Sequence, residues 1–153
     1  MQCSKCGQEV PADAQGLTVT RSVESLETYV NWGKPDADVL VPVGKGLEIL
    51  PLTHPTGLFA GEQAGFRVLL EGKPLVGQVV AVVPSGVRYR GVLNETAVTT
   101  DSKGEFTVTW PLAGMYWLNA TYPRQSKPEP GAPRAEMPAT RYATAVTLEV
   151  MPQ

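Results

Sequence analysis

Alternation of apolar and polar residues, interrupted by glycine and proline, is the feature that most constrains the fold of this chain. In "EFTVTW" (105–110), Phe106, Val108 and Trp110 alternate with a glutamate and two threonines. Successive side chains of a strand point to opposite faces, so the pattern predicts one buried face and one wetter face. The 15 glycines and 14 prolines fall mostly between such runs, where they form turns and end strands. The sequence therefore predicts an all-β fold.

Further strands are predicted from runs rich in β-branched and aromatic residues. The run at 17–32 also fits a helical face through Val23, Leu26 and Val30, but its threonines and valines favour a strand. Together with the stretch above, about seven or eight strands indicate an antiparallel β-sandwich. The remaining runs lie at 46–52, 64–72, 77–85, 116–122 and 141–150.

The stretch from 99 to 122, "TTDSKGEFTVTWPLAGMYWLNATY", predicts a β-hairpin with a polar turn in front of it. Asp101 is expected to accept hydrogen bonds from the backbone of its own turn, and Gly104 to take the tight geometry that returns the chain to the sheet. Pro111 and Gly114 are expected to reverse the chain between the two strands. The second strand would then have an inward row of Tyr116, Leu118, Ala120 and Tyr122.

The length suits one compact domain, because 153 residues with 42% hydrophobic side chains can build a single core. We place this domain at 17–150, after a flexible N-terminal segment at 1–16 that contains a Cys-x-x-Cys pair. Residues 123–140 hold five prolines and little apolar material. They are expected to form an exposed loop or a partly disordered excursion.

Charge and hydropathy argue against two classes of partner. The net charge is −2, with 13 basic and 15 acidic side chains, which predicts no nucleic-acid partner and no anionic membrane surface. No apolar stretch reaches the roughly 20 residues of a membrane-spanning helix, so no membrane insertion is expected. Residues 1–10 lack the apolar segment of a secretory signal. The signal of an exported protein would therefore not be part of this chain.

Cys3 and Cys6 are the first candidates for chemistry. Their spacing matches half of a tetrahedral thiolate site for zinc, and the missing donors would have to come from a second copy or from His54. The pair also fits a local disulfide or redox pair, or an inert tail. His54, the only histidine, is interpreted either as a loop residue beside Pro55 or as a surface metal contact.

Catalysis has little support in the sequence. The chain contains no GxSxG, HExxH or phosphate-binding loop, and one histidine cannot build a multi-histidine metal site. We therefore expect no enzymatic activity, and we expect the Arg-Tyr-Arg triplet at 88–90 to lie on a strand. Trp32, Trp110 and Trp117 offer anchors for a partner. Trp117 stands out because it lies opposite the inward row, where it would either bind or simply cover the sheet.

Two segments resemble a known kind of domain. "GKPLVGQVVAVVPSG" (72–86), followed by residues 99–122, is similar to transthyretin-like and carboxypeptidase-regulatory-like domains, with a GKPL-type turn, a TD-x-x-G-x-F turn and strand, and a P-x-x-G-x-Y-x-L strand. With the upstream residues 44–75, the chain resembles a bacterial periplasmic family of unknown function historically labelled a nickel-uptake substrate-specific component. The resemblance implies a sandwich of prealbumin type, a periplasmic location and a link to nickel uptake.

Two functional hypotheses follow. The first is a non-catalytic periplasmic binding or accessory module, associated through the resemblance with uptake of nickel or another transition metal. The alternative is a metal-binding or redox-active protein that acts through Cys3 and Cys6, with zinc or nickel as the metal. A protein partner or a metal ion is the expected ligand, and no other cofactor is expected. The candidate metal ligands are Cys3, Cys6 and His54.

Overall fold

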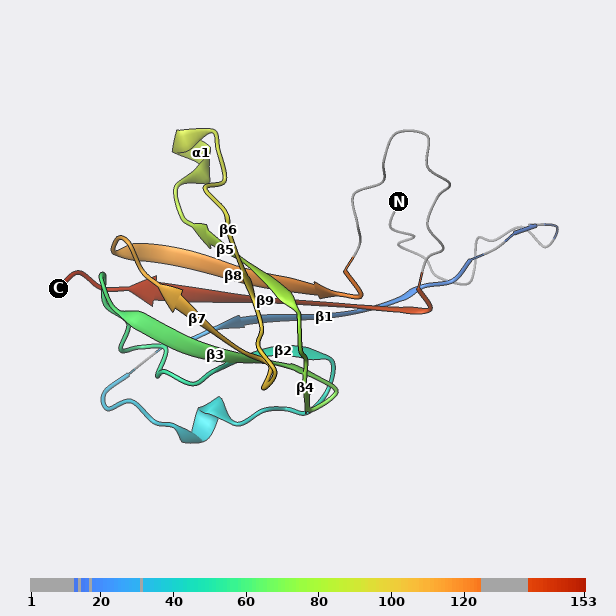
Figure 1. Cartoon of the computed structure of the whole chain (residues 1–153), viewed down its shortest axis with the longest axis horizontal. Helices are drawn as coiled ribbons and strands as arrows, with labels where there is room; N and C mark the ends of the chain where they lie inside the picture. The colour runs from blue at the N-terminus through green and yellow to red at the C-terminus, as the bar shows by residue number, and fades with distance from the viewer. Residues whose placement is uncertain (1–12, 14, 17, 31, 125–137) are drawn as a thin grey trace.

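The computed structural model describes residues 13, 15–16, 18–30, 32–124 and 138–153. Nine strands in this part of the chain form two sheets, which Figure 1 shows as two stacked layers. The first sheet contains, in spatial order, β1 (Arg21–Thr28), β9 (Thr140–Val150), β8 (Gly114–Tyr122), β5 (Val79–Pro84) and β6 (Thr96–Thr99). The second contains β2 (Leu47–Pro51), β3 (Gln63–Leu70), β4 (Lys73–Pro74) and β7 (Glu105–Thr109), and β3 pairs with each of the other three. The predicted all-β sandwich is confirmed.

β1 differs from the other strands in its direction. It runs parallel to β9, with Arg21 opposite Thr140 and Thr28 opposite Thr147, whereas the other paired strands of the two sheets are antiparallel. A parallel pair cannot be joined by a tight turn, and here it joins the first and the last strand of the described chain. β9 lies between β1 and β8, so the last strand of the sequence connects β1 to the rest of its sheet.

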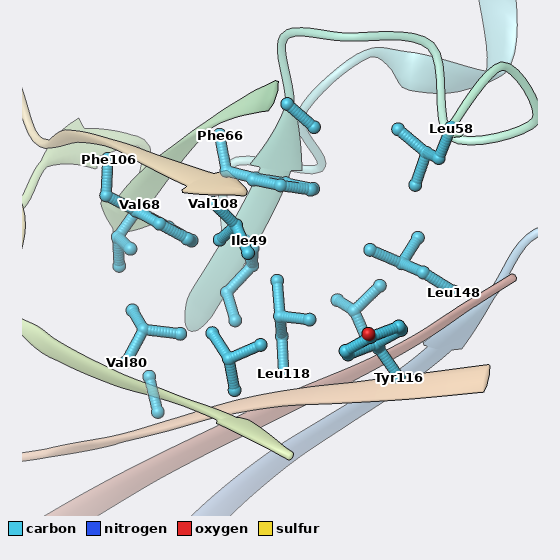
Figure 2. Packing of buried hydrophobic residues seen from close by; sticks show 14 of the residues in the cluster. Ile49, Leu58, Phe66, Val68, Val80, Phe106, Val108, Tyr116, Leu118 and Leu148 are labelled. Atoms are coloured by element: carbon cyan, nitrogen blue, oxygen red, sulfur yellow. The ribbon is translucent and has the colours of Figure 1, made fainter. Parts of the chain in front are cut away.

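The core lies between the two layers, where apolar side chains from both sheets meet (Figure 2). Phe66 of β3 and Phe106 of β7 stack with their ring centroids 5.3 Å apart, and Trp110 meets Phe66 edge to face at 6.3 Å. The predicted inward rows are confirmed at six positions that are at most 6% exposed, namely Phe106, Val108, Trp110, Tyr116, Leu118 and Ala120.

The predicted hairpin of residues 105–110 and 116–122 is wrong, although both runs are strands. β7 pairs with β3, and β8 pairs with β5 and β9 in the other sheet. The connection at 110–113 therefore crosses from one sheet to the other. Alternation defines which face of a strand is buried, and both strands bury the expected face. It does not choose the neighbouring strand.

The strand expected at 88–90 is also wrong, because Val87–Arg90 form one helical turn, α1. Gly86 and Gly91 flank it with φ of 84° and 72°, a conformation that side chains disfavour. Figure 1 shows α1 standing away from both sheets. The Arg90 guanidinium donates hydrogen bonds to three carbonyl oxygens at the two ends of this excursion, those of Pro84, Ser85 and Leu93. No helix in the described part of the chain is long and apolar enough to cross a membrane.

The turn in front of β7 has the predicted geometry. Asp101 Oδ1 accepts hydrogen bonds from the backbone N–H groups of Lys103 at 2.8 Å and Glu105 at 2.9 Å, and Gly104 has φ of 73°. The N–H groups of Glu105 and Lys103 hold the pKa of Asp101 below its usual value of 3.8. The carboxylate is therefore part of the turn. The proline-rich segment expected at 123–140 falls mostly outside the described residues.

Candidate functional site

A hollow surrounds Tyr29, just after the end of β1. It consists of two pockets of about 200 and about 280 Å³, and Tyr29 and Leu40 line both. The first pocket is also lined by Trp32, Lys34, Asp36 and His54. The second is also lined by Glu27, Glu48 and residues 41–43. We call this region the Tyr29 hollow.

The chain after β1 forms one wall of the hollow. Gly33 takes φ of 83° and Pro35 follows, so the extended run ends here. Asp36 Oδ1 accepts a hydrogen bond of 2.9 Å from the N–H of Asp38, the first residue of the 3₁₀ turn η1 (Asp38–Leu40). Figure 1 shows this segment passing along the side of β2 and β3 that faces away from β8.

The side chain of Glu48 binds the end of this segment, at Val43 and Gly44. It lies on β2 and is only 5% exposed. Its carboxylate oxygens accept hydrogen bonds from the N–H groups of Val43 at 2.7 Å and Gly44 at 2.9 Å. A buried carboxylate is costly unless it is hydrogen-bonded, and these two donors meet that need. Glu48 therefore positions the loop that lines the second pocket.

Tyr29 donates a hydrogen bond of 3.0 Å to Oε2 of Glu27, whose Oε1 accepts one of 3.3 Å from Ser25. Burial raises the pKa of the Tyr29 phenol far above its usual value of 10.0, and the Glu27 and Glu48 carboxylates raise this pKa further. Tyr29 is therefore a neutral hydrogen-bond donor in the folded protein. Tyr29 lines both pockets, and its hydroxyl is already engaged.

His54 lies on the wall of the first pocket, opposite the 32–46 segment. Its Nδ1 is 3.3 Å from the backbone N–H of Thr56 and 2.9 Å from the hydroxyl of the same residue, and its Nε2 is 3.3 Å from the carbonyl oxygen of Asp36. A backbone N–H can only donate, so Nδ1 is the acceptor and Nε2 carries the proton. His54 therefore links two loops. A metal ion at either nitrogen would have to displace one of these contacts.

The other two predicted metal ligands, Cys3 and Cys6, lie outside the described residues. Within the residues that the structure describes, no three His, Cys, Asp or Glu side chains gather as a metal-binding group. The three-residue set of Cys3, Cys6 and His54 stays a prediction.

Among the tryptophans, Trp32 is the most exposed. It is 99% exposed at the first pocket, whereas Trp117 is 46% exposed on the outer face of its sheet and Trp110 is fully buried. The sequence signal for Trp32 is its place after the last alternating residue and directly before Gly33. Tyr29 and Glu48 were missed, because each looks like an ordinary member of an alternating run.

The fold and the hollow define a β-sandwich protein with a loop-walled hollow beside the end of β1. Residues 2–124 match the family described as "Domain of unknown function (DUF4198)". The match covers most of the chain, and the protein belongs to this family. The matched range includes both cysteines and the whole Tyr29 hollow, and it ends before β9. No curated protein and no solved structure gave a match.

Proposed function

We propose that this protein is a non-catalytic binding or accessory module, and that it meets its ligand or partner at the Tyr29 hollow. The observation that carries this proposal is Trp32, whose side chain is 99% exposed beside a pocket. An indole contributes a large contact area when a ligand or partner covers it. Tryptophan is also enriched among the residues that dominate binding energies.

The surroundings of Trp32 support recognition. The first pocket combines the indole with a cation at Lys34 and a carboxylate at Asp36, and a few polar groups around an apolar surface are typical of binding sites. The groups best suited to acid–base chemistry are already engaged with the protein, namely Glu27, Glu48 and His54.

The periplasmic location and the link to transition-metal uptake belong to the same proposal and rest on the resemblance of residues 44–122. The prealbumin type of sandwich rests on the same segment. The described donors of the hollow do not complete a transition-metal site, because they offer one imidazole with both nitrogens engaged. The metal part of the proposal therefore rests on Cys3 and Cys6, with His54 as a further donor.

The alternative function, a metal-binding or redox-active protein acting through Cys3 and Cys6, is favoured by one observation. The Cys-x-x-Cys spacing falls inside the range that matches the family. In this alternative the sandwich serves as a carrier for the N-terminal thiols, and the Tyr29 hollow has no part in binding.

NMR spectroscopy of the ¹⁵N-labelled chain separates the two functions. Glucose, benzoate and nickel(II) chloride are added separately as probes of a neutral, an anionic and a metal ligand. Binding at the hollow is expected to change the indole signal of Trp32 and the amide signal of Thr56, and to leave Trp110 unchanged. The response should disappear in Trp32→Ala and persist in the matched variant Trp117→Ala.

Two outcomes count against the hollow. If none of the probes changes the Trp32 signal, the hollow is not a site for these ligand classes and the proposal is wrong. If nickel(II) broadens only the signals of residues 1–16, and Cys3→Ser abolishes the broadening, the alternative function is supported instead.

A further inference from the structure

We propose that the free edge of β1 is a self-association surface, at which β1 of one copy pairs antiparallel with β1 of a second copy. β1 forms one edge of the five-stranded sheet, and among the residues that the structure describes it pairs only with β9. No described strand lies along its other edge, which we call the open edge. This proposal is independent of what binds at the Tyr29 hollow.

The backbone of β1 shows which residues can pair with a new strand. The N–H of Arg21 donates to the carbonyl oxygen of Ala139 at 2.9 Å, and Arg21 is the register partner of Thr140. In a regular parallel ladder, alternate residues turn both backbone groups toward the same neighbour. The odd-numbered residues of β1 thus face β9. Residues 22, 24, 26 and 28 turn their N–H and C=O groups to the open edge.

The open edge of β1 is longer and less protected than the other sheet edges in the described chain. β6 has four residues and β7 has five, and β2 ends at Pro51 and is flanked by the loop that Glu48 holds. β1 has eight residues with no proline, glycine or lysine, the residues that often protect edges. Its inward-facing charge, Glu27, is already engaged by Ser25 and Tyr29.

The side chains on the outer face of β1 favour one register for the pairing of the two β1 strands. Leu26 is 83% exposed and sits beside Ala145 on the outer face. A two-fold pairing centred on Glu24 would set two carboxylates opposite each other, and one centred on Ser25 would set Leu26 opposite Glu24. Centring on Leu26 brings the two leucines together and places Glu24 opposite Thr28. This register covers the exposed leucine without opposing like charges.

The resulting dimer is closed by two-fold symmetry, since both copies use the same edge. Two five-stranded sheets become one continuous sheet across the axis. A single strand pair covers less surface than a standard stable interface. The association is therefore expected to be reversible and to depend on protein concentration.

Disulfide cross-linking of the full chain tests the register directly. In a Cys3→Ser, Cys6→Ser background, Leu26→Cys places the two thiols across the axis, at a Cα separation of about 5.5 Å that a disulfide can bridge. Glu24→Cys is the matched control, because its two copies are about 14 Å apart along the strands. We expect Leu26→Cys to form disulfide-linked dimer at least about tenfold faster than Glu24→Cys, because only the Leu26→Cys pair is close enough for a disulfide to bridge.

Sedimentation velocity over a range of concentrations tests the association itself. Leu26→Lys should raise the dimer dissociation constant by about tenfold or more, because it removes an apolar pair and opposes two cations. Leu112→Lys, at an exposed leucine in the connection before β8, should leave the constant unchanged. A monomeric wild-type chain at the highest concentration, or equal cross-linking of Glu24→Cys and Leu26→Cys, overturns the proposal.

Discussion

Gly104→Ala should destabilise this protein much more than Gly77→Ala, although the two glycines share nearly the same backbone conformation. Their φ angles are 73° and 70°. A Cβ at Gly104 would lie 3.0 Å from both the nitrogen of Leu75 and the carbonyl oxygen of Val68, whereas a Cβ at Gly77 meets nothing within 4 Å. The pair therefore separates backbone strain, which is common to both, from steric conflict, which only Gly104 has.

The expected magnitudes follow from these contacts. The left-handed conformation costs an L-residue about 1–2 kcal/mol, and Gly77→Ala should lose that amount. At Gly104 the obstructing atoms belong to the backbone and cannot rotate away. Leu75 N–H and the Val68 carbonyl are hydrogen-bonded to each other at 2.9 Å, so relief requires a shift of paired backbone. Overpacking of this kind adds about 1–3 kcal/mol, for a total of about 2–5 kcal/mol.

Urea unfolding followed by tryptophan fluorescence measures both variants, because Trp110 is fully buried in the folded state. Domains of this size have a total stability of about 5–15 kcal/mol, so the loss at Gly104 should lower the unfolding midpoint visibly at unchanged slope. Equal destabilisation of the two variants would refute the steric argument. It would show that the turn moves freely enough to accommodate a methyl group.

Three further predictions concern single side chains. Glu48→Ala should lower the free energy of unfolding by about 1–3 kcal/mol, since it removes the charged acceptor of two partly buried hydrogen bonds. Exposed Glu24→Ala should stay within about 0.5 kcal/mol, and equal losses in urea unfolding would contradict this. Because folding lowers the pKa of Asp101, the stability that this carboxylate contributes to the folded protein is complete above pH 3.8. It is lost as the pH falls through the lower pKa of the folded state. Asp101→Asn should therefore flatten the acid side of a plot of Tm against pH, and an unchanged acid side would contradict the assignment. Arg90→Ala should speed hydrogen exchange at 85–93 while leaving the unfolding midpoint nearly unchanged, because the contacts it removes are exposed and local; unchanged exchange would show that the excursion holds without its guanidinium.

Residues 99–122 show which structural features can be predicted from the local sequence and which cannot. Alternation predicted that Trp110 and Tyr116 are buried, and both are, because the direction of a side chain depends only on its own extended backbone. The same reasoning paired the two runs with each other, and that is wrong. The choice of partner depends on which distant strand completes the core, and Phe66 of β3 meets Phe106 there.

The candidate site was predictable only in part. The sequence singled out Trp32 as one of three tryptophans that could anchor a partner, and His54 as the single imidazole. Nothing in the sequence indicated that Glu48 would hold the 41–44 loop. Its neighbours alternate like those of any strand, and its role comes from a loop that returns over the outer face of β2.

Short-range chemistry in the chain was enough to set the class of fold, the positions of seven of the strands, the buried faces and the Asp101–Gly104 turn, because each depends on residues close together along the backbone. Strand partners, the parallel placement of β1 beside β9 and the assembly of the Tyr29 hollow arise only in the folded protein. They join residues far apart in sequence, and their selection reflects competition for one shared core rather than the preference of any single segment.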